Sequence, residues 1–376
     1  MKSSVKSTAL EPGPDDFEGT GLNRVIHIGK RQLPVYGLVV LLIGLLALFS
    51  LLRPDTFPTY LNFRVIAFGK SVPMLLALAV SFPMIAGKID LSVGYAVGLW
   101  HMLAFTLQIR YGVPWWATVL IVIVAGGLVG LFNALLVELA QVDAFIATLA
   151  TGQVLFAITQ WHSGNRQVTD TKGAIPAIFK KLGTWEFLKI PGPFLVAILI
   201  AAVMYVVLDY TPMGRYLYVA GANPRAAELS GISRRKYVSG AFVISGMIAA
   251  FAGVIYAART SAAQANVGPD LLLPALAAAF LGSTTIRPGR VNAWGTVVGI
   301  VIAAAGISGL TQVFPNRSYL DQLFNGLTLM AAIVIASWAG RRRLSVRERV
   351  ASVATVADDP PTNQQDQSST IRGETK

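Results

Sequence analysis

PWWATVLIVIVAGGLVGLFNALLVEL, residues 114–139, is the stretch that decides the fold of this chain. Glu138 is its single ionisable side chain. A helix needs about 20 mostly apolar residues to cross the hydrocarbon core of a bilayer, and this run is longer than that. The segment therefore predicts a transmembrane helix.

The overall composition agrees with a membrane protein. Apolar residues make up 54% of the 376-residue chain, and charged residues only 13%. Soluble domains carry about 25% charged residues, so this chain has too little charge to coat a soluble globule. The absence of cysteine excludes disulfides, iron–sulfur clusters and thiolate catalysis. The net charge of +12 is typical of loops beside anionic lipid headgroups. We therefore expect the lipid bilayer, and no nucleic acid, as a partner.

Ten apolar segments are candidates for membrane spans. They are residues 34–52, 65–86, 91–109, 114–139, 144–161, 193–209, 238–258, 271–283, 293–312 and 321–339. The eighth is too short to cross a bilayer alone, and Pro269 and Pro274 interrupt its start. We expect an all-α, polytopic transmembrane helix bundle of about ten spans with a short or broken eighth helix.

Three GxxxG patterns fall inside these spans, beginning at Gly94, Gly126 and Gly295. Small residues four apart let the backbones of neighbouring helices approach closely. The patterns predict a compact bundle and identify no substrate.

The ends of the chain are polar. Residues 1–33 predict an N-terminal tail, residues 34–340 the membrane domain, and residues 341–376 a disordered C-terminal tail. With ten spans both tails lie on one side, and Lys and Arg are more numerous on that side than on the other. The positive-inside rule then predicts that both termini are cytoplasmic, although the basic segment 162–192 would lie outside.

The sequence lacks the patterns of an enzyme. His27, His101 and His162 are scattered, and no cluster has the spacing of metal ligands. Gly69-Lys70-Ser71 resembles the end of a phosphate-binding loop, but the pattern requires Gly where Arg64 stands. We expect no catalytic residues, no metal and no cofactor. An ion-coupled secondary transporter usually carries ionisable residues within its spans, and here the ionisable residues near the spans lie close to their ends. Such a transporter is therefore the alternative to a transporter driven by another subunit.

Residues 210–237 are more ordered in composition than a linker. Asn223-Pro224 predicts a capped helix start, and Gly231 predicts its end. The expected element is a helix of two turns on the cytoplasmic side. It is either an incidental turn in a basic loop or a rigid element that docks into a cytoplasmic partner.

At this segment the chain resembles a known family. TPMGRYLYVAGANPRAAELSGI, residues 211–232, is similar to the characteristic loop of sugar-type ABC importer permeases, the ribose-like branch of a family shared with branched-chain amino acid permeases. IAGKIDLSVG at 85–94 and VDAFIATLAT at 142–151 resemble two further motifs, and the resemblance covers roughly residues 35–340. The chain departs from the family pattern at Lys88, Asp143, Ser283, Pro288-Gly289 and Val291.

The resemblance implies a division of labour. The chain would be the permease of the bacterial inner membrane, built from inverted repeats and present as a homodimer or paired with another permease. A cytoplasmic ATP-binding-cassette ATPase would hydrolyse ATP, and a periplasmic or lipid-anchored solute-binding protein would deliver a monosaccharide or polyol. The residues implied in coupling to the ATPase are Gly221, Asn223, Pro224, Arg225, Ala226, Ala227 and Gly231.

Polar residues in or beside the spans are candidates for the substrate pathway, because a sugar needs hydrogen-bond donors and acceptors but no counter-charge. These candidates are Asp90, Ser92, Asn133, Thr148, Thr151 and Gln153. The alternative for each is hydrogen bonding between helices, and Asp90 is also placed to cap a helix beginning at Leu91.

Overall fold

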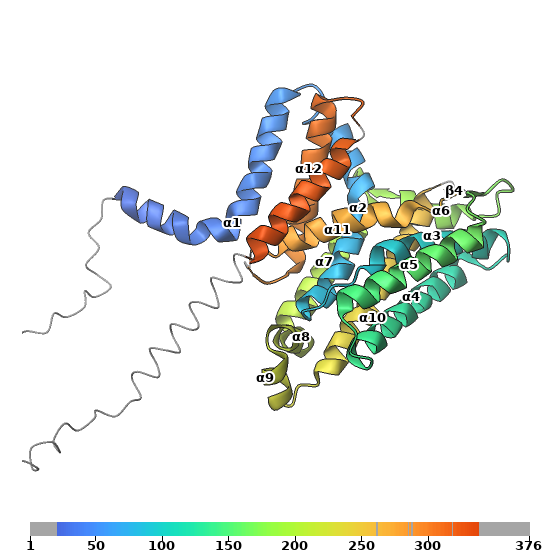
Figure 1. Ribbon diagram of the computed structural model, residues 1–376. Helices are drawn as coiled ribbons and strands as arrows, with labels where there is room; N and C mark the ends of the chain where they lie inside the picture. The colour runs from blue at the N-terminus through green and yellow to red at the C-terminus, as the bar shows by residue number, and fades with distance from the viewer. Residues whose placement is uncertain (1–20, 261, 285, 287–288, 318, 338–376) are drawn as a thin grey trace, which may run out of the picture.

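The computed structural model describes residues 21–260, 262–284, 286, 289–317 and 319–337, and within them the chain is mostly helical (Figure 1). The helices are α1 (Gly21–Leu52), α2 (Tyr60–Ile85), α3 (Ser92–Ile109), α4 (Trp115–Glu138), α5 (Ala144–Ser163), α6 (Ala177–Thr184), α7 (Gly192–Tyr210), α8 (Pro212–Ala222), α9 (Pro224–Leu229), α10 (Arg234–Arg259), α11 (Val267–Gly282), α12 (Ala293–Val313) and a last helix, Tyr319–Ser337. Two short antiparallel pairs join β1 (Val168–Thr169) to β4 (Ala262–Ala263) and β2 (Glu186–Phe187) to β3 (Ile190–Pro191). The predicted helical bundle is confirmed.

Each predicted span coincides with a helix. Among the described residues, 7 helices are long and apolar enough to cross a membrane: α2, α4, α5, α7, α10, α12 and the last helix. The apolar part of α1, Gly37–Leu52, and α11 are shorter. The remaining predicted span is α3.

The eighth predicted span is short but unbroken. α11 has 16 residues, and a helix of that length measures about 24 Å. The expectation that Pro269 and Pro274 interrupt its start is wrong, because the helix already begins at Val267 and includes both. Pro269 lies in the first turn, where the missing N–H costs no helical hydrogen bond, and Pro274 is buried inside the helix.

The chain is already helical before the predicted end of its polar tail. α1 begins at Gly21, and Figure 1 shows it bending sharply partway along its length. The rest of the predicted N-terminal tail and the predicted C-terminal tail, 341–376, lie outside the described residues.

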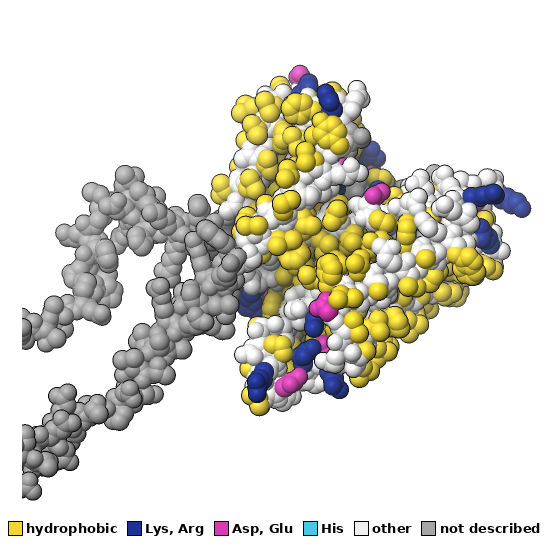
Figure 2. All heavy atoms as spheres, viewed as in Figure 1, with side chains coloured by type: hydrophobic (Ala, Val, Ile, Leu, Met, Phe, Trp, Pro, Cys, Tyr) yellow, Lys and Arg dark blue, Asp and Glu magenta, His cyan; other side chains and the backbone are white. Residues whose placement is uncertain are grey.

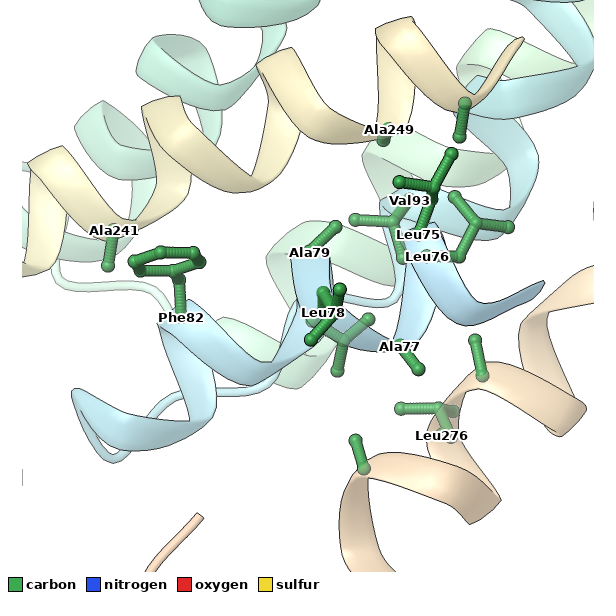
Figure 3. Packing of buried hydrophobic residues seen from close by; sticks show 14 of the residues in the cluster. Leu75, Leu76, Ala77, Leu78, Ala79, Phe82, Val93, Ala241, Ala249 and Leu276 are labelled. Carbon is green, nitrogen blue, oxygen red and sulfur yellow. The ribbon is translucent and has the colours of Figure 1, made fainter. Parts of the chain in front are cut away.

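The core forms around α2. Residues 71–83 of this helix are all buried, as expected for a helix that is apolar on every side. Figure 3 shows Phe82 facing Ala241 of α10 and Ala77 lying beside Leu276 of α11. By contrast, α4 exposes large apolar side chains such as Leu120 and Leu128. In Figure 2 apolar side chains cover much of the visible flank, and most Lys and Arg lie toward its extremities.

α4 and α10 pack with their backbones in contact. A Cβ added at Gly126 would lie 2.5 Å from the carbonyl oxygen of Gly246, and one at Gly130 would lie 2.2 Å from that of Phe242. No side chain fits at either position without displacing a helix. The close packing predicted from the Gly126–Gly130 pattern is therefore present.

The segment between α5 and α7 is folded, which its sequence did not predict. It contains α6, whose Phe179 is completely buried. The carboxylate of Asp170 accepts hydrogen bonds from the backbone N–H groups of Ala174 (2.7 Å) and Ile175 (3.2 Å) and pairs with Lys180 at 3.5 Å.

Candidate functional site

The predicted short helix in the 210–237 segment is present as α9. The side chain of Asn223 caps it by accepting a hydrogen bond from the N–H of Ala226 at 3.1 Å. Gly231 ends the turn with a φ of 75°, a conformation that glycine adopts without strain. The helix α8, which precedes α9, was not predicted.

The two faces of α9 have opposite surroundings. Ala227 is completely buried, whereas Arg225, Ala226 and Glu228 are exposed. Leu229 is 85% exposed at the end of the helix. Sequence reasoning missed Leu229. The feature of the sequence that could have identified it is an apolar residue at the last position of the predicted helix, next to the turn at Gly231.

α8 lies directly on the turn between α2 and α3. A Cβ added at Gly221 would lie 2.0 Å from the carbonyl oxygen of Ile85 and 3.0 Å from Cα of Ala86. On the other side of the contact, Gly87 has a φ of 74°, and its Cβ position would be 3.1 Å from the carbonyl oxygen of Gly221. Glycine at both positions lets the two backbones touch.

A second contact holds α8 against the segment that leads into α12. The hydroxyl of Tyr218 donates a hydrogen bond to the carbonyl of Val291 at 2.7 Å. The guanidinium of Arg290 lies over the Tyr218 ring, 4.0 Å from its centroid. Any displacement of α8 is therefore felt both at the α2–α3 turn and at the start of α12.

The α2–α3 turn leads into a buried polar cluster, which consists of Asp90, Ser92, Asn133 and Ser245. One carboxylate oxygen of Asp90 accepts from the N–H of Ser92 (3.0 Å) and from its hydroxyl (2.6 Å). The other accepts from the hydroxyl of Ser245 at 3.0 Å. The amide nitrogen of Asn133 donates to the Ser92 hydroxyl at 2.8 Å.

The polar cluster ties three helices to one turn. Ser92 begins α3, Asn133 belongs to α4 and Ser245 to α10, and Asp90 is only 1% exposed. α3 begins at Ser92 and not at the expected Leu91, which is instead its N-cap residue and makes no side-chain cap hydrogen bond. Asp90, one position earlier, binds the N–H of Ser92. Ser245, 155 positions from Asp90 in the chain, was not among the predicted site residues.

The predicted residues on α5 are divided by their surroundings. The hydroxyl of Thr148 accepts from the N–H of Leu91 at 3.0 Å and donates to the carbonyl of Ala144 at 2.8 Å, so it joins α5 to the start of α3. Thr151 is buried farther along α5. Gln153 is exposed and donates to the hydroxyl of Tyr95 at 3.2 Å.

An ion pair lies beside the 210–237 segment. The carboxylate of Glu138, at the end of α4, is 2.8 Å from the guanidinium of Arg234, at the start of α10. The side chain of Glu138 is only 3% exposed, so removing Arg234 would leave a buried carboxylate without its partner.

The described residues contain no group of three His, Asp or Glu side chains that could hold a metal ion. Gly69-Lys70-Ser71 lies inside α2, whereas a phosphate-binding loop lies between a strand and a helix.

Known proteins resemble the chain over most of its length. Residues 65–335 match a family described as the permease component of branched-chain amino acid transport systems. The chain is 31% identical to the ribose import permease of Haemophilus influenzae over 85% of this chain and 97% of that protein. It is 30% identical to the ribose import permease of Bacillus subtilis over 80% and 91% of the two chains. It is 28% identical to the D-allose transport system permease of Escherichia coli over 80% and 90%. No solved structure matches the chain.

Proposed function

This chain belongs to the family of branched-chain amino acid transport permease components, in its ribose-like sugar branch, and on that premise we propose that it moves a monosaccharide or related polyol into the cytoplasm. We propose further that ATP hydrolysed by a partner subunit drives the movement. The chain would be the membrane-spanning subunit of an ABC importer.

One observation carries the proposal. α9 exposes Arg225, Ala226 and Leu229, and α8, which precedes it, rests through Gly221 on the turn that leads into the polar cluster. A cytoplasmic ATPase that moves α9 would thereby displace the starts of α3 and α12. Gly221, Asn223, Pro224, Ala227 and Gly231 give this segment its shape. In this proposal Arg225 and Ala226 contact the ATPase, and Leu229, which is also exposed, joins them.

The proposal includes the arrangement in the membrane. We propose ten spans in two inverted repeats, with α1, α3 and α11 completing the set, and both termini in the cytoplasm of a bacterium. Two such permeases, identical or paired, would enclose the pathway, and a periplasmic or lipid-anchored binding protein would deliver the sugar. The exposed apolar side chains of α4 and of the last helix suit contact with lipid or with the second permease.

The polar residues take different parts in this proposal. Asp90, Ser92, Asn133 and Thr148 fix the backbone at the start of α3 and so shape the wall of the pathway. Thr151 and Gln153 lie farther along α5, the helix that contains Thr148. Gln153, with its exposed amide beside Tyr95, is the member placed to contact a sugar directly.

The test is transport by purified components. The chain is reconstituted into liposomes with and without its cognate ATPase and binding protein, and uptake of radiolabelled D-ribose and D-allose is measured. We expect accumulation only when ATP and both partners are present. Accumulation driven by a proton or sodium gradient without the ATPase would contradict the proposal and identify a secondary transporter.

A further inference from the structure

A small cavity lies at the end of the bundle opposite α8 and α9. Its volume is about 230 Å³, and its lining consists of His101, Gln167, Tyr256, Thr260, Ala262 and Gln264. Figure 1 places β4, which contributes Ala262, at one end of the bundle and α9 at the other. Ala262 and Gln264 lie in and just after β4, and Gln167 lies just before β1.

The inner part of the cavity presents buried polar groups. His101 of α3 is completely buried, and its Nε2 is 3.0 Å from the hydroxyl oxygen of Thr260. The carbonyl of Ala262 lies beside the ring, but Nδ1 of His101 makes no hydrogen bond of good geometry within the described part of the chain. Because His101 has no exposed surface, the polar group that a ligand meets in the inner part of the cavity is the half-buried hydroxyl of Thr260, which His101 holds in place.

The rim of the cavity includes the amide side chains of two residues whose backbones face each other. β1 and β4 pair with Val168 opposite Ala263, and this register places Gln167 opposite Gln264 at the next position. Both side chains are exposed. The cavity thus combines imidazole and hydroxyl groups inside with two amides at its mouth. None of these groups is a carboxylate or an ammonium.

The lining also selects the kind of ligand. None of the described residues that line the cavity is Asp, Glu, Lys or Arg. The guanidinium of Arg259, 5.2 Å from the centroid of the Tyr256 ring, already donates to the carbonyl of Phe68, so the lining offers a ligand hydrogen bonds and no carboxylate or ammonium group. Tyr256 adds a half-buried aromatic ring, which suits the C–H groups of a sugar. Sites for drug-sized ligands enclose about 300–1,000 Å³. A cavity of about 230 Å³ therefore suits one sugar ring.

We propose that this cavity is a binding site for a single neutral monosaccharide or polyol at the outer end of the permease. The inference rests on the proposed function, because that function places this end on the side where the binding protein releases sugar. Thr260, Gln167 and Gln264 supply hydrogen bonds, His101 positions the Thr260 hydroxyl, and Tyr256 supplies an apolar surface. The site receives the sugar before it enters the bundle.

The test measures binding and uptake on the same variants. Equilibrium binding of radiolabelled D-ribose and D-allose is measured on the detergent-purified permease–ATPase complex without binding protein. We expect saturable binding of at least one sugar, weakened about fivefold or more, or roughly 1 kcal/mol, by His101→Gln and by Gln264→Ala. Gln264 is exposed, so its truncation leaves the core intact.

The matched control is a second histidine–threonine pair, His162 and Thr106. Nε2 of His162 is 3.0 Å from the hydroxyl of Thr106, the same separation as in the His101–Thr260 pair, but His162 does not line the cavity. His162→Gln should bind sugar as the wild type does. Thermal unfolding of each variant verifies that it is folded.

The outcomes separate the two proposals. Uptake that needs ATP and both partners, together with unchanged binding in His101→Gln and Gln264→Ala, would overturn the cavity assignment and leave the proposed function standing. Absence of any sugar binding to the wild-type complex would have the same meaning. Weakened binding in both variants, with uptake driven by an ion gradient and not by ATP, would retain the sugar site and overturn the importer.

Discussion

At the end of the bundle that carries α8 and α9, the closest contact joins two backbones, whereas the opposite end contains a cavity lined by polar side chains. Gly221 lies on the carbonyl of Ile85 with no room for a Cβ. Around β1, β4 and α6 backbones also touch, since a Cβ at Gly183 would lie 2.5 Å from the backbone nitrogen of Arg259, but side-chain hydrogen bonds such as those of Asp170 and His101 are added there. Contact between two backbones transmits displacement stiffly, because no rotamer can absorb it. Polar side chains around a cavity are suited to recognising a solute.

The largest effect on stability and uptake is expected from a substitution in the polar cluster, which follows the α2–α3 turn. Asp90→Ala removes the acceptor of three hydrogen bonds, from the N–H and hydroxyl of Ser92 and from the hydroxyl of Ser245. Each buried group left unsatisfied costs about 1–3 kcal/mol, so the unfolding midpoint of the purified protein should fall markedly and uptake should be lost. Asp90→Asn, which keeps one acceptor oxygen, should be milder.

Asp170→Ala is the matched change at the other end. It removes the acceptor of the Ala174 and Ile175 hydrogen bonds in a loop outside the bundle. Its effect on the unfolding midpoint should be clearly smaller than that of Asp90→Ala. Equal midpoints for the two variants would mean that the ends do not differ as described.

A second, intermediate effect concerns the exposed tip of α9. Leu229 is 85% exposed, so Leu229→Asp should leave the unfolding midpoint unchanged. If Leu229 docks into the ATPase, ATP-driven uptake should drop about tenfold, which corresponds to roughly 1.4 kcal/mol. Ala226→Trp should act in the same way, since Ala226 is also exposed. Wild-type uptake in both variants would leave α9 without a coupling role.

Ala227 requires a separate interpretation. It is completely buried, so a large residue there would disturb packing as well as coupling. Loss of uptake in an Ala227 variant therefore does not report on the ATPase contact.

The smallest effect is local and depends on pH. Partial burial raises the pKa of Asp170, but the hydrogen bonds from Ala174 and Ile175 and the charge of Lys180 outweigh it, so the pKa is lowered. A lowered folded-state pKa stabilises the loop fully above the unfolded value of about 3.9. That stability is lost as the pH falls through the folded-state pKa.

Hydrogen exchange measures this local stability. The amides of Ala174 and Ile175 should be protected at neutral pH in the wild type and lose protection in acid. In Asp170→Asn the protection should be lower at neutral pH and change little between the two conditions. A pH dependence that is the same in both proteins, after correction for intrinsic exchange, would contradict the assignment.

The parts of this molecule that the sequence predicted depend on local chemistry. The spans follow from apolar runs, and α9 follows from the Asn223 cap and the Gly231 turn, all within a few residues. α8 was missed because its sequence has glycines, Gly214 and Gly221, that read as a loop. Those glycines are required by contacts with the carbonyls of Leu208 and Ile85, which no local pattern reveals.

The sites depend on residues that are distant in the chain. Asp90 was identified as a polar residue near a span, but its partner Ser245 belongs to another helix 155 positions away. The cavity requires His101 to meet Thr260, 159 positions away, and requires β1 to pair with β4. A pairing of two residues on each side leaves no recognisable strand pattern in the sequence, so Gln167 and Gln264 could not be placed together.

The central claim is that the Gly221 contact carries motion from α9 to the bundle, and the ratio of sugar transported to ATP hydrolysed tests it most directly. Both quantities are measured on the same proteoliposomes for the wild type, Gly221→Ala and the control Gly240→Ala. A Cβ at Gly221 collides with the carbonyl of Ile85 at 2.0 Å, whereas one at Gly240 meets nothing within 4 Å. We predict that Gly221→Ala continues to support ATP hydrolysis while the ratio falls about tenfold, and that Gly240→Ala matches the wild type. A wild-type ratio in folded Gly221→Ala would contradict the account.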